Sequence, residues 1–258
     1  MKPKLTIVKI GGNVIDNPEL LDSVLADFAK LENAKILVHG GGKLATRLGE
    51  KLGIEAKFHK GRRITDQAML EIAVMSYAGG TNKSIVAKLQ ALGVNAIGLT
   101  GADGNLILSE KRAVKTVDFG FVGDVRKVDS EALRNLIQCG FVPVFAAITH
   151  DGKGKLLNTN ADTIASEIAI ACSDFFDTEL LYCFEKPGVL ANSEDGDSVI
   201  SLLDAELYQR LKAENKVHSG MLPKLDNCFR ALENGVSVVK VGSEKLLSDQ
   251  NSGTKIQP

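Results

Sequence analysis

Two clusters of glycine near the start of the chain are the first candidates for a binding site. Gly11-Gly12 follows the apolar run 5–10, and Gly40-Gly41-Gly42 follows Ile36-Leu37-Val38-His39. In an open parallel sheet, ligands bind beyond the carboxyl ends of the strands. Glycine there permits a positive φ and lets backbone N–H groups approach an anion, with a helix N-terminus behind them. One cluster alone could be a tight turn without a ligand, but two favour a site for a phosphoryl group.

Two lysines could supply positive charge to that group. Lys9 interrupts an otherwise apolar strand directly before Gly11-Gly12, and a buried ammonium group there is costly unless an anion meets it. The alternative for Lys9 is a side chain that reaches back to solvent. Lys224 lies one turn into a helix that opens with Gly220-Met221-Leu222-Pro223, since proline favours the first turn of a helix. On its own, Lys224 would be interpreted as a surface residue.

A cluster of polar residues at 156–162 stands directly ahead of an alanine-rich helix. Asn160 could cap this helix, and Asp162 would then lie in its first turn. Capping explains one or two of these polar side chains but leaves Asn158 without a structural reason. Asn158 and Asp162 are therefore further candidates for the site.

The sequence lacks the usual signatures of nucleotide-binding and metal-binding proteins. No GxxxxGK[ST] motif occurs, because the segment Gly79-Gly80-Thr81-Asn82-Lys83-Ser84 has Asn82 where the last glycine belongs. No GxGxxG follows a strand either, which disfavours a P-loop NTPase and a dinucleotide dehydrogenase. The four cysteines are widely spaced and form no CxxC pair. We expect reduced core thiols, as in a cytoplasmic protein, and no metal held by protein ligands.

The elements that must position these residues alternate along almost the whole chain. Helical spacing predicts helices at 20–30, 43–52, 66–78, 82–92, 130–138, 162–171, 204–214 and 221–233. Apolar runs predict strands at 5–10, 36–38, 95–100, 141–147, 179–184 and 236–241, and hairpin pieces at 106–108 and 113–117. This alternation indicates an α/β fold with a largely parallel sheet covered on both faces. A mild composition shift at 173–178 predicts, within one domain, an N-terminal lobe of about residues 1–174 and a C-terminal lobe of about residues 175–258.

Composition and charge exclude several classes of function. The chain has 258 residues, of which 44% are hydrophobic and 24% charged, as expected for an ordinary globular protein. Its formal net charge is −1, and it has three Tyr, ten Phe and no Trp. We therefore expect neither nucleic acid nor a charged membrane surface as a partner. No apolar run approaches the ~18–20 residues that span a bilayer, and the run 5–10 is too short for a signal peptide.

Taken in order, these motifs resemble those of the amino acid kinase family. The resemblance covers essentially the whole chain, and the segment Gly61-Arg62-Arg63-Ile64-Thr65-Asp66 points to the branch that acts on acylated glutamate. The family fold is an open αβα sandwich around a largely parallel sheet, in agreement with the pattern of elements above. The motifs that carry the resemblance are Lys9-Ile10-Gly11-Gly12, His39-Gly40-Gly41-Gly42, Lys60-Gly61-Arg62-Arg63-Ile64-Thr65, Asn158-Thr159-Asn160-Ala161-Asp162, Gly188-Val189-Leu190, Gly220-Met221-Leu222-Pro223-Lys224 and Ser252-Gly253-Thr254.

The resemblance implies an enzyme that uses ATP and Mg²⁺ to phosphorylate the γ-carboxylate of N-acetyl-L-glutamate in arginine biosynthesis. Lys9 and Lys224 would be the catalytic cations, one from each lobe, and Asp162 would hold both in place. The residues implied to bind the small-molecule acceptor are Gly41, Gly42, Arg63 and Asn158, with Arg63 on its α-carboxylate. The residues implied to bind ATP and its phosphates are Gly11, Gly12, Gly40, Glu185, Gly188 and Lys224, with segments 185–190 and 216–218 lining the nucleotide.

Two departures from the family pattern carry expectations of their own. Glu185-Lys186-Pro187-Gly188 replaces the usual Asp-x-x-Gly of the nucleotide loop, which leaves the contact made by Glu185 open. The first strand begins by residue 5, ahead of which no N-terminal helix of the kind used by arginine-inhibited hexamers would fit. We therefore expect a homodimer that is insensitive to arginine.

Two alternatives to this function stay open. Arg62 beside Arg63 offers an extra cation, so N-succinyl-L-glutamate could be the acceptor, unless Arg62 faces solvent. A non-catalytic nucleotide-binding sensor is the alternative from another class. Such a sensor would keep the glycine loops but lose the lysines, and the presence of Lys9, Asp162 and Lys224 together argues against it.

Overall fold

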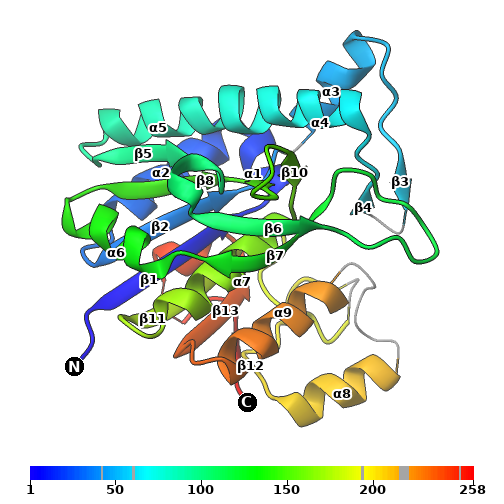
Figure 1. The fold of residues 1–258 in the computed structure, drawn as a ribbon. Helices are drawn as coiled ribbons and strands as arrows, with labels where there is room; N and C mark the ends of the chain where they lie inside the picture. The colour runs from blue at the N-terminus through cyan, green and yellow to red at the C-terminus, as the bar shows by residue number, and fades with distance from the viewer. Residues whose placement is uncertain (42, 60–61, 193–194, 215–220, 250) are drawn as a thin grey trace.

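A central sheet of eight strands organises the part of the chain that the structure describes. The computed structural model describes residues 1–41, 43–59, 62–192, 195–214, 221–249 and 251–258. The strand order is β12-β14-β13-β11-β1-β2-β8-β5 (Figure 1). The strands, in sequence order, are β1 (Lys4–Ile10), β2 (Ala34–His39), β5 (Ala96–Leu99), β8 (Val142–Ala146), β11 (Asp177–Cys183), β12 (Leu202–Leu203), β13 (Val238–Gly242) and β14 (Thr254–Ile256).

Six of these strands run parallel, so their carboxyl ends meet at one edge of the sheet. β1 pairs in parallel with both β11 and β2, and β13, β8 and β5 continue the same direction outward. β14 is antiparallel to β13 and closes one side together with β12. The predicted α/β class with a largely parallel sheet is confirmed.

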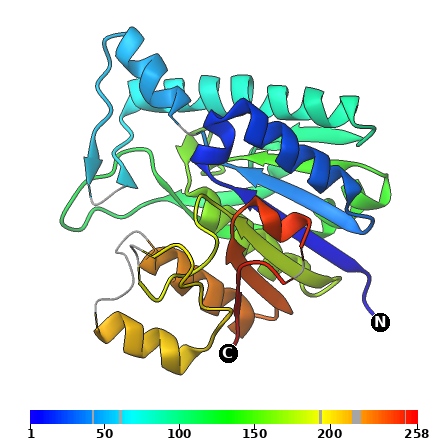
Figure 2. The ribbon, with the colours of Figure 1, turned by 180° about the vertical axis from the view of Figure 1, so that it is seen from behind.

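Helices cover both faces of the sheet, as Figures 1 and 2 show from opposite sides. The helices, including the π-helical segment η1 and the 3₁₀ segments η2 and η3, are α1 (Gly12–Asp16), α2 (Pro18–Lys30), α3 (Leu44–Lys51), α4 (Gln67–Ala73), η1 (Val74–Thr81), α5 (Asn82–Ala91), η2 (Asp103–Asn105), α6 (Ser130–Gln138), α7 (Ala161–Cys172), α8 (Ala205–Ala213), α9 (Leu222–Glu233) and η3 (Glu244–Leu247). Two separate apolar cores result, one on each face.

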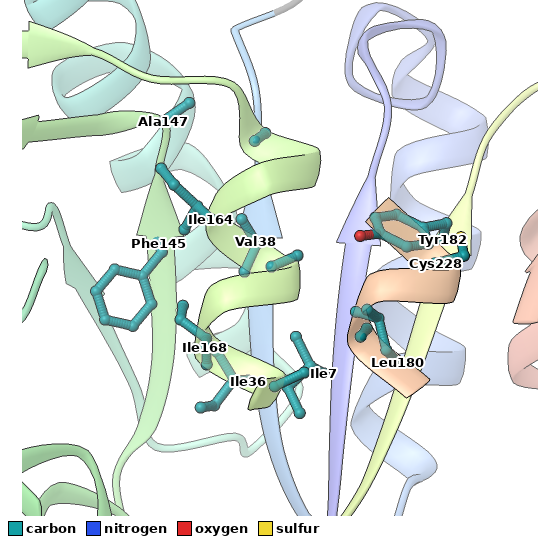
Figure 3. Packing of buried hydrophobic residues seen from close by; sticks show 14 of the residues in the cluster. Ile7, Ile36, Val38, Phe145, Ala147, Ile164, Ile168, Leu180, Tyr182 and Cys228 are labelled. Carbon is teal, nitrogen blue, oxygen red and sulfur yellow. The ribbon is translucent and has the colours of Figure 1, made fainter. Parts of the chain in front are cut away.

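The alternation of side chains along β1 explains the two cores. Leu5 and Ile7 point into the core under α7 and α9, whereas Val8 and Ile10 point into the core under α2 and α5. Figure 3 shows the first of these cores, in which α7 presents Ile164 and Ile168 to the strands. Lys9 follows Ile7 by two residues, so this alternation places its side chain on the face that α7 and α9 cover.

The order of the strands creates a switch point beside β1. The strands of the N-terminal part extend from β1 through β2 to β5, and those of the C-terminal part extend the other way from β11. Ligands of open α/β sheets bind outside the carboxyl ends of the strands where the order reverses in this way. The ends of β1, β2 and β11 are therefore the place where the fold itself predicts a site.

A second, four-stranded sheet and a short hairpin lie beside this edge. The order of the second sheet is β10-β9-β6-β7, and β3 pairs with β4 as a separate two-stranded ribbon. Their bounds are β3 (Phe58–His59), β4 (Arg62–Arg63), β6 (Ile107–Lys111), β7 (Gly123–Val128), β9 (Ile148–His150) and β10 (Leu156–Asn158). The segment after the hairpin meets the second sheet where Thr65 pairs with Gly120, and Val122, just ahead of β7, pairs with Asn158 of β10.

Two predictions of secondary structure were wrong. Segment 113–117 is not a strand, because its side chains are largely exposed (Val114 by 60%) and give it no face to bury. The helices predicted at 66–78 and 82–92 form one continuous run, because η1 carries the helix through Gly79-Gly80. The Asn82 N–H donates to the carbonyl of Tyr77, the i→i+5 bond of a π-helix. No helix or strand was predicted from the sequence at α1, β3, β4, β7, β9, β10, β12 and β14.

Among the described residues, no helix is both long enough and apolar enough to cross a bilayer. The four cysteines are free thiols. Cys172, Cys183 and Cys228 are buried, as predicted for core thiols, whereas Cys139 is exposed, so the prediction was wrong for this residue.

Candidate functional site

Two ammonium groups from opposite parts of the chain meet at one carboxylate beside the switch point. Lys9 Nζ lies 2.8 Å from Asp162 Oδ1, and Lys224 Nζ lies 2.7 Å from Asp162 Oδ2. The three side chains are only 11–17% exposed. β1, α7 and α9 each contribute one member, so the convergence that the sequence predicted is observed.

Local sequence explains how α7 delivers this carboxylate. Asn160 caps the helix, its side chain accepting a hydrogen bond from the Thr163 N–H at 3.1 Å. Asp162 is therefore in the first turn, where the helix dipole favours a negative charge. The Tyr182 hydroxyl donates to the backbone carbonyl of Asp162 at 3.0 Å, which ties the first turn of α7 to β11.

Charges in this site are balanced by their neighbours. Burial alone would raise the pKa of Asp162, but Lys9 and Lys224 outweigh burial and hold that pKa well below its usual range. Burial lowers the pKa of Lys9, and the Asp162 carboxylate opposes that shift. Asp162 is thus a permanent anion that pairs with both lysines and is no candidate for a general base.

Two aromatic rings also lie close to the Lys224 ammonium group. Its Nζ lies 5.1 Å from the ring centre of Tyr182 and 5.7 Å from that of Phe184, distances at which a cation is attracted to the face of a ring. Burial raises the pKa of Tyr182 well above its ordinary value, so this residue stays a neutral donor to Asp162. Sequence reasoning missed Tyr182. The signal was a tyrosine in a buried strand, whose hydroxyl needs a partner.

The first glycine loop differs from the prediction in two ways. Gly11 has φ −81° and ψ 168°, and the φ angles of Gly12, Gly40 and Gly41 are not positive either. The Gly11 N–H donates to the Cys183 carbonyl at 3.0 Å, so it joins β1 to β11 and is not available to an anion. A Cβ at Gly11 would stand 3.9 Å from the Lys9 ammonium and 3.5 Å from the Cys183 carbonyl oxygen, which are ordinary contact distances. Gly12 opens α1 and is partly exposed.

The second glycine loop packs closely against two elements. Gly40 faces the start of α7, with the Ala161 Cβ 3.9 Å from where its own Cβ would stand. Gly41 lies under the ring of Tyr77, whose Cε1 occupies a point 1.5 Å from where a Cβ would be. Only glycine fits at residue 41, because of this close approach and not because of its φ. Gly42 lies outside the described residues.

Arg63 and Asn158 lie on the neighbouring hairpin and second sheet. The Arg63 guanidinium donates to Thr46 Oγ1 at 2.9 Å and stacks on Phe58, with 4.7 Å between the guanidinium carbon and the ring centre. Asn158 Nδ2 donates to Thr65 Oγ1 at 3.0 Å. Arg62 is exposed, whereas Arg63 is half-buried, as expected for consecutive residues of a strand.

A chain of contacts connects Arg63 to the charged cluster. Tyr77 is buried, and burial raises its pKa while the nearby Arg63 guanidinium acts in the opposite direction. Tyr77 covers Gly41, and the adjacent Gly40 faces Ala161, the neighbour of Asp162. Tyr77, which the sequence analysis did not single out, therefore stands between the two groups of predicted residues.

The predicted nucleotide residues lie at the end of β11. Glu185 is exposed directly beyond this strand, and Gly188 is buried against the last strand. A side chain at Gly188 would stand 2.7 Å from Thr254 Oγ1, which itself accepts a hydrogen bond from the Val189 N–H at 2.8 Å. Residues 216–218, predicted to line the nucleotide, are outside the described residues.

No group of three or more His, Cys, Asp or Glu side chains that could hold a metal ion occurs among the residues the structure describes. Mg²⁺ commonly keeps several waters and is held largely by substrate phosphates.

Comparisons with known proteins agree with this geometry. Residues 4–243 match the model of the amino acid kinase family. The chain is 53% identical over 257 residues to the acetylglutamate kinase of Phocaeicola vulgatus, covering 100% of both chains. It is also 53% identical over 259 residues to the acetylglutamate kinase of Cytophaga hutchinsonii, covering 98% of each. Among solved structures, the smu.665 protein of Streptococcus mutans UA159 has a TM-score of 0.82 at 23% identity, covering 98% of both chains, and so shares the fold.

The ion-pair cluster predicts how acid affects stability. Asp162→Asn leaves two buried ammonium groups without their anion and should lower the free energy of unfolding at pH 7 by roughly 3 kcal/mol. The pKa of Asp162 is lower in the folded chain than its ordinary value of 3.8. The contribution of Asp162 to the free energy of unfolding is therefore complete above about pH 4 and is lost as the pH falls towards the pKa of the folded state. Urea unfolding at a series of pH values should show the gap between wild type and variant narrowing below about pH 4.

Asp204→Asn is the matched control, because the Asp204 side chain caps α8 by accepting from the Leu207 N–H, and asparagine caps equally well. A gap for Asp162→Asn that stays constant with pH would contradict the prediction.

Proposed function

The chain belongs to the amino acid kinase family, and from this premise we propose that it phosphorylates N-acetyl-L-glutamate to N-acetyl-L-glutamyl 5-phosphate in arginine biosynthesis, with ATP as the donor. Relatives that share about half of their residues with it along the whole chain are acetylglutamate kinases. The observation that carries the proposal is the meeting of Lys9 and Lys224 at Asp162.

The chemistry needs charge and alignment and no general base. The γ-carboxylate of the acceptor is already ionised at neutral pH, since an unperturbed Glu side chain has a pKa of ~4.3. One of its oxygens attacks the γ-phosphorus of ATP, the new O–P bond forms, and the bond to the β–γ bridging oxygen breaks to release ADP. No proton has to move. Catalysis then depends on in-line positioning and on neutralising the charge of the migrating phosphoryl group.

In this proposal Lys9 and Lys224 bind the oxygens of that phosphoryl group from two sides. Asp162 is a positioning residue that keeps the two ammonium groups close together by pairing with both of them. Because Tyr182 and Phe184 lie close to Lys224, the ammonium group is directed before substrate arrives. Such preorganised charge in a shielded site is the largest contribution to many enzymatic rates.

The acceptor would lie on the β2 side of the switch point. Arg63 would bind its α-carboxylate, because a guanidinium can donate two parallel hydrogen bonds to a planar anion, and Asn158 would bind the same end of the molecule. Gly41 and Gly42 would donate backbone N–H groups to it. This arrangement is consistent with the contacts that join Arg63, Tyr77 and Gly41.

The nucleotide would lie on the β11 side, against Glu185 and Gly188, with its phosphates towards Gly12, Gly40 and Lys224. Gly11 would act by joining the ends of β1 and β11 beside Lys9, since its N–H is bonded to the Cys183 carbonyl. Mg²⁺ on the β- and γ-phosphates would neutralise part of their charge. Glu185, exposed at this edge, is the carboxylate placed to approach the ion or the ribose. The lobes proposed from the sequence, about residues 1–174 and 175–258, would thus carry one substrate each.

We also propose a homodimer and a cytoplasmic location. Met75 and Leu92, which are 53% and 46% exposed, lie on and just beyond the helical run η1–α5, beside the half of the sheet that ends with the edge strand β5. These features could be covered by a second copy. The free thiols at Cys172, Cys183 and Cys228 are typical of a reducing compartment.

The central test traps the acyl phosphate as its hydroxamate, with ATP, Mg²⁺ and N-acetylglutamate. Wild-type protein should form the hydroxamate, and Lys9→Met should lose at least ~10²-fold in rate, as when one donor to a transition-state anion is removed. Lys35→Met is the control, because Lys35 is a buried lysine of neighbouring β2 that caps α2 at the opposite edge of the sheet; it should keep its rate. A wild-type protein that binds ATP yet forms no hydroxamate would instead be the nucleotide-binding sensor.

The identity of the acyl group is tested through the two adjacent arginines. Because Arg62 is exposed and Arg63 is half-buried, Arg63→Ala should raise the KM for N-acetylglutamate by at least ~10-fold, whereas Arg62→Ala should leave it nearly unchanged. The measurement is kcat/KM for N-acetyl- and N-succinylglutamate with both variants. A preference for the succinyl compound that Arg62→Ala abolishes would overturn the assignment of the acetyl group.

The oligomeric state is tested by size-exclusion chromatography with light scattering, with and without arginine. We expect the mass of two chains and unchanged activity in the presence of arginine. A hexamer, a monomer or inhibition by micromolar arginine would each contradict the proposal.

A further inference from the structure

His39 occupies an unusual place for a titratable side chain. It is the last residue of β2, directly before Gly40-Gly41, and it is fully buried. Its Nδ1 lies 2.7 Å from the carbonyl oxygen of Gly40, and its Nε2 lies 3.0 Å from Nδ2 of Asn82. The imidazole therefore bridges the second glycine loop and the first residue of α5.

The partners of His39 determine which of its nitrogens carries the proton. The Gly40 carbonyl can only accept, so Nδ1 must be the protonated nitrogen. The Asn82 amide nitrogen can only donate, so Nε2 must be bare. Burial lowers the pKa of His39 to about 4, so the ring is neutral under physiological conditions. One tautomer of a neutral imidazole satisfies both contacts.

Asn82 is itself held so that it cannot turn its amide around. Its Nδ2 also donates to the Val144 carbonyl on β8 at 2.9 Å, and the residue is 1% exposed. Its Oδ1 points at Gly98 on β5, where a Cβ would come within 2.0 Å. Rotating the amide would place an oxygen against the Val144 carbonyl. Asn82 thus fixes the position of the His39 ring relative to β8 and α5.

The bond from His39 to Gly40 fixes a peptide group of the loop. In a trans peptide the carbonyl of one residue and the N–H of the next point in opposite directions within one plane. Because His39 binds the Gly40 carbonyl, the Gly41 N–H must point away from the His39 ring and from α5. The Gly40 position faces Ala161 of α7, the helix that carries Asp162. Within the described residues, no hydrogen bond of the Gly41 N–H is observed.

We propose that His39 and Asn82 are positioning residues that aim the Gly41 N–H at the acceptor carboxylate. The inference rests on the proposed function for its substrate, but the geometry of the relay does not depend on it. The segment that resembles the end of a P-loop in the sequence has a role of this kind, because its Asn82 orients the glycine loop through a histidine.

Kinetics of matched variants test the proposal. His39→Leu removes both bonds, whereas His39→Asn can keep a donor close to the place of Nδ1 and so retain the bond to Gly40. We expect His39→Leu and Asn82→Ala to raise the KM for N-acetylglutamate by at least ~10-fold and to lower kcat/KM by about 10², because a small misplacement of a binding group has an effect of this size. The KM for ATP should not change, and His39→Asn should recover most of the loss.

Lys35→Met is again the control, since Lys35 is a buried polar residue of the same strand at its other end. It should reduce stability without altering the KM for the acceptor. Equal increases in both KM values, an unchanged KM for the acceptor in His39→Leu, or no recovery in His39→Asn would overturn the proposal.

A spectroscopic measurement on the wild-type protein tests the relay even if the variants do not fold. Nitrogen-15 shifts of His39 should show a protonated Nδ1 and a bare Nε2, and the amide signal of Gly41 should move on addition of N-acetylglutamate. A protonated Nε2 would overturn the proposal. Absence of kinase activity together with the expected tautomer would refute the proposed function while leaving the relay in place.

Discussion

The carboxylate of Asp162 is the constraint on which the rest of the site depends. Two largely buried ammonium groups repel each other and lose hydration, and both costs are large without an anion between them. Asp162 offsets these costs with one oxygen for each lysine. It can do so only while α7 and α9 lie on the same face of the sheet as Lys9. The packing of Ile164, Ile168 and Cys228 against the strands (Figure 3) therefore also keeps the three charged side chains together.

The topology of the sheet separates the part of the site proposed for the acceptor from the part proposed for the nucleotide. β2 and the hairpin beside it present one set of polar groups, and β11 with its following loop presents another. β1 lies between them and pairs with both neighbours along its length. The Gly11 N–H, bonded to the Cys183 carbonyl, joins the ends of β1 and β11. The two halves of the site are thus both built on β1.

Much of this arrangement could be predicted from sequence because it follows from the spacing of apolar residues and from residues whose burial is energetically costly. Apolar strands alternating with helices fix the fold class, and Lys9 is conspicuous because a charge interrupts an apolar strand. The roles of Gly11 and Gly41 were predicted on the wrong grounds. Their φ angles are ordinary, and what requires the absence of a side chain at Gly41 is the Tyr77 ring, a contact between residues 36 positions apart. Long-range contacts of this kind, like those of Tyr182 and Asn82, leave only a weak local signal in the sequence.

The π-helical turn at Val74–Thr81 has a consequence for how the long helix α4–α5 can vary. In a regular α-helix, residues five apart differ by about 140° around the axis, so Tyr77 and Asn82 would project in different directions. The wider turn, closed by the bond from the Asn82 N–H to the Tyr77 carbonyl, brings them closer to one side of the helix. One covers Gly41, and the other reaches His39. Deleting a single residue here would regularise the helix and rotate one side chain away from the loop. The length of this segment is therefore as restricted as the identity of its residues.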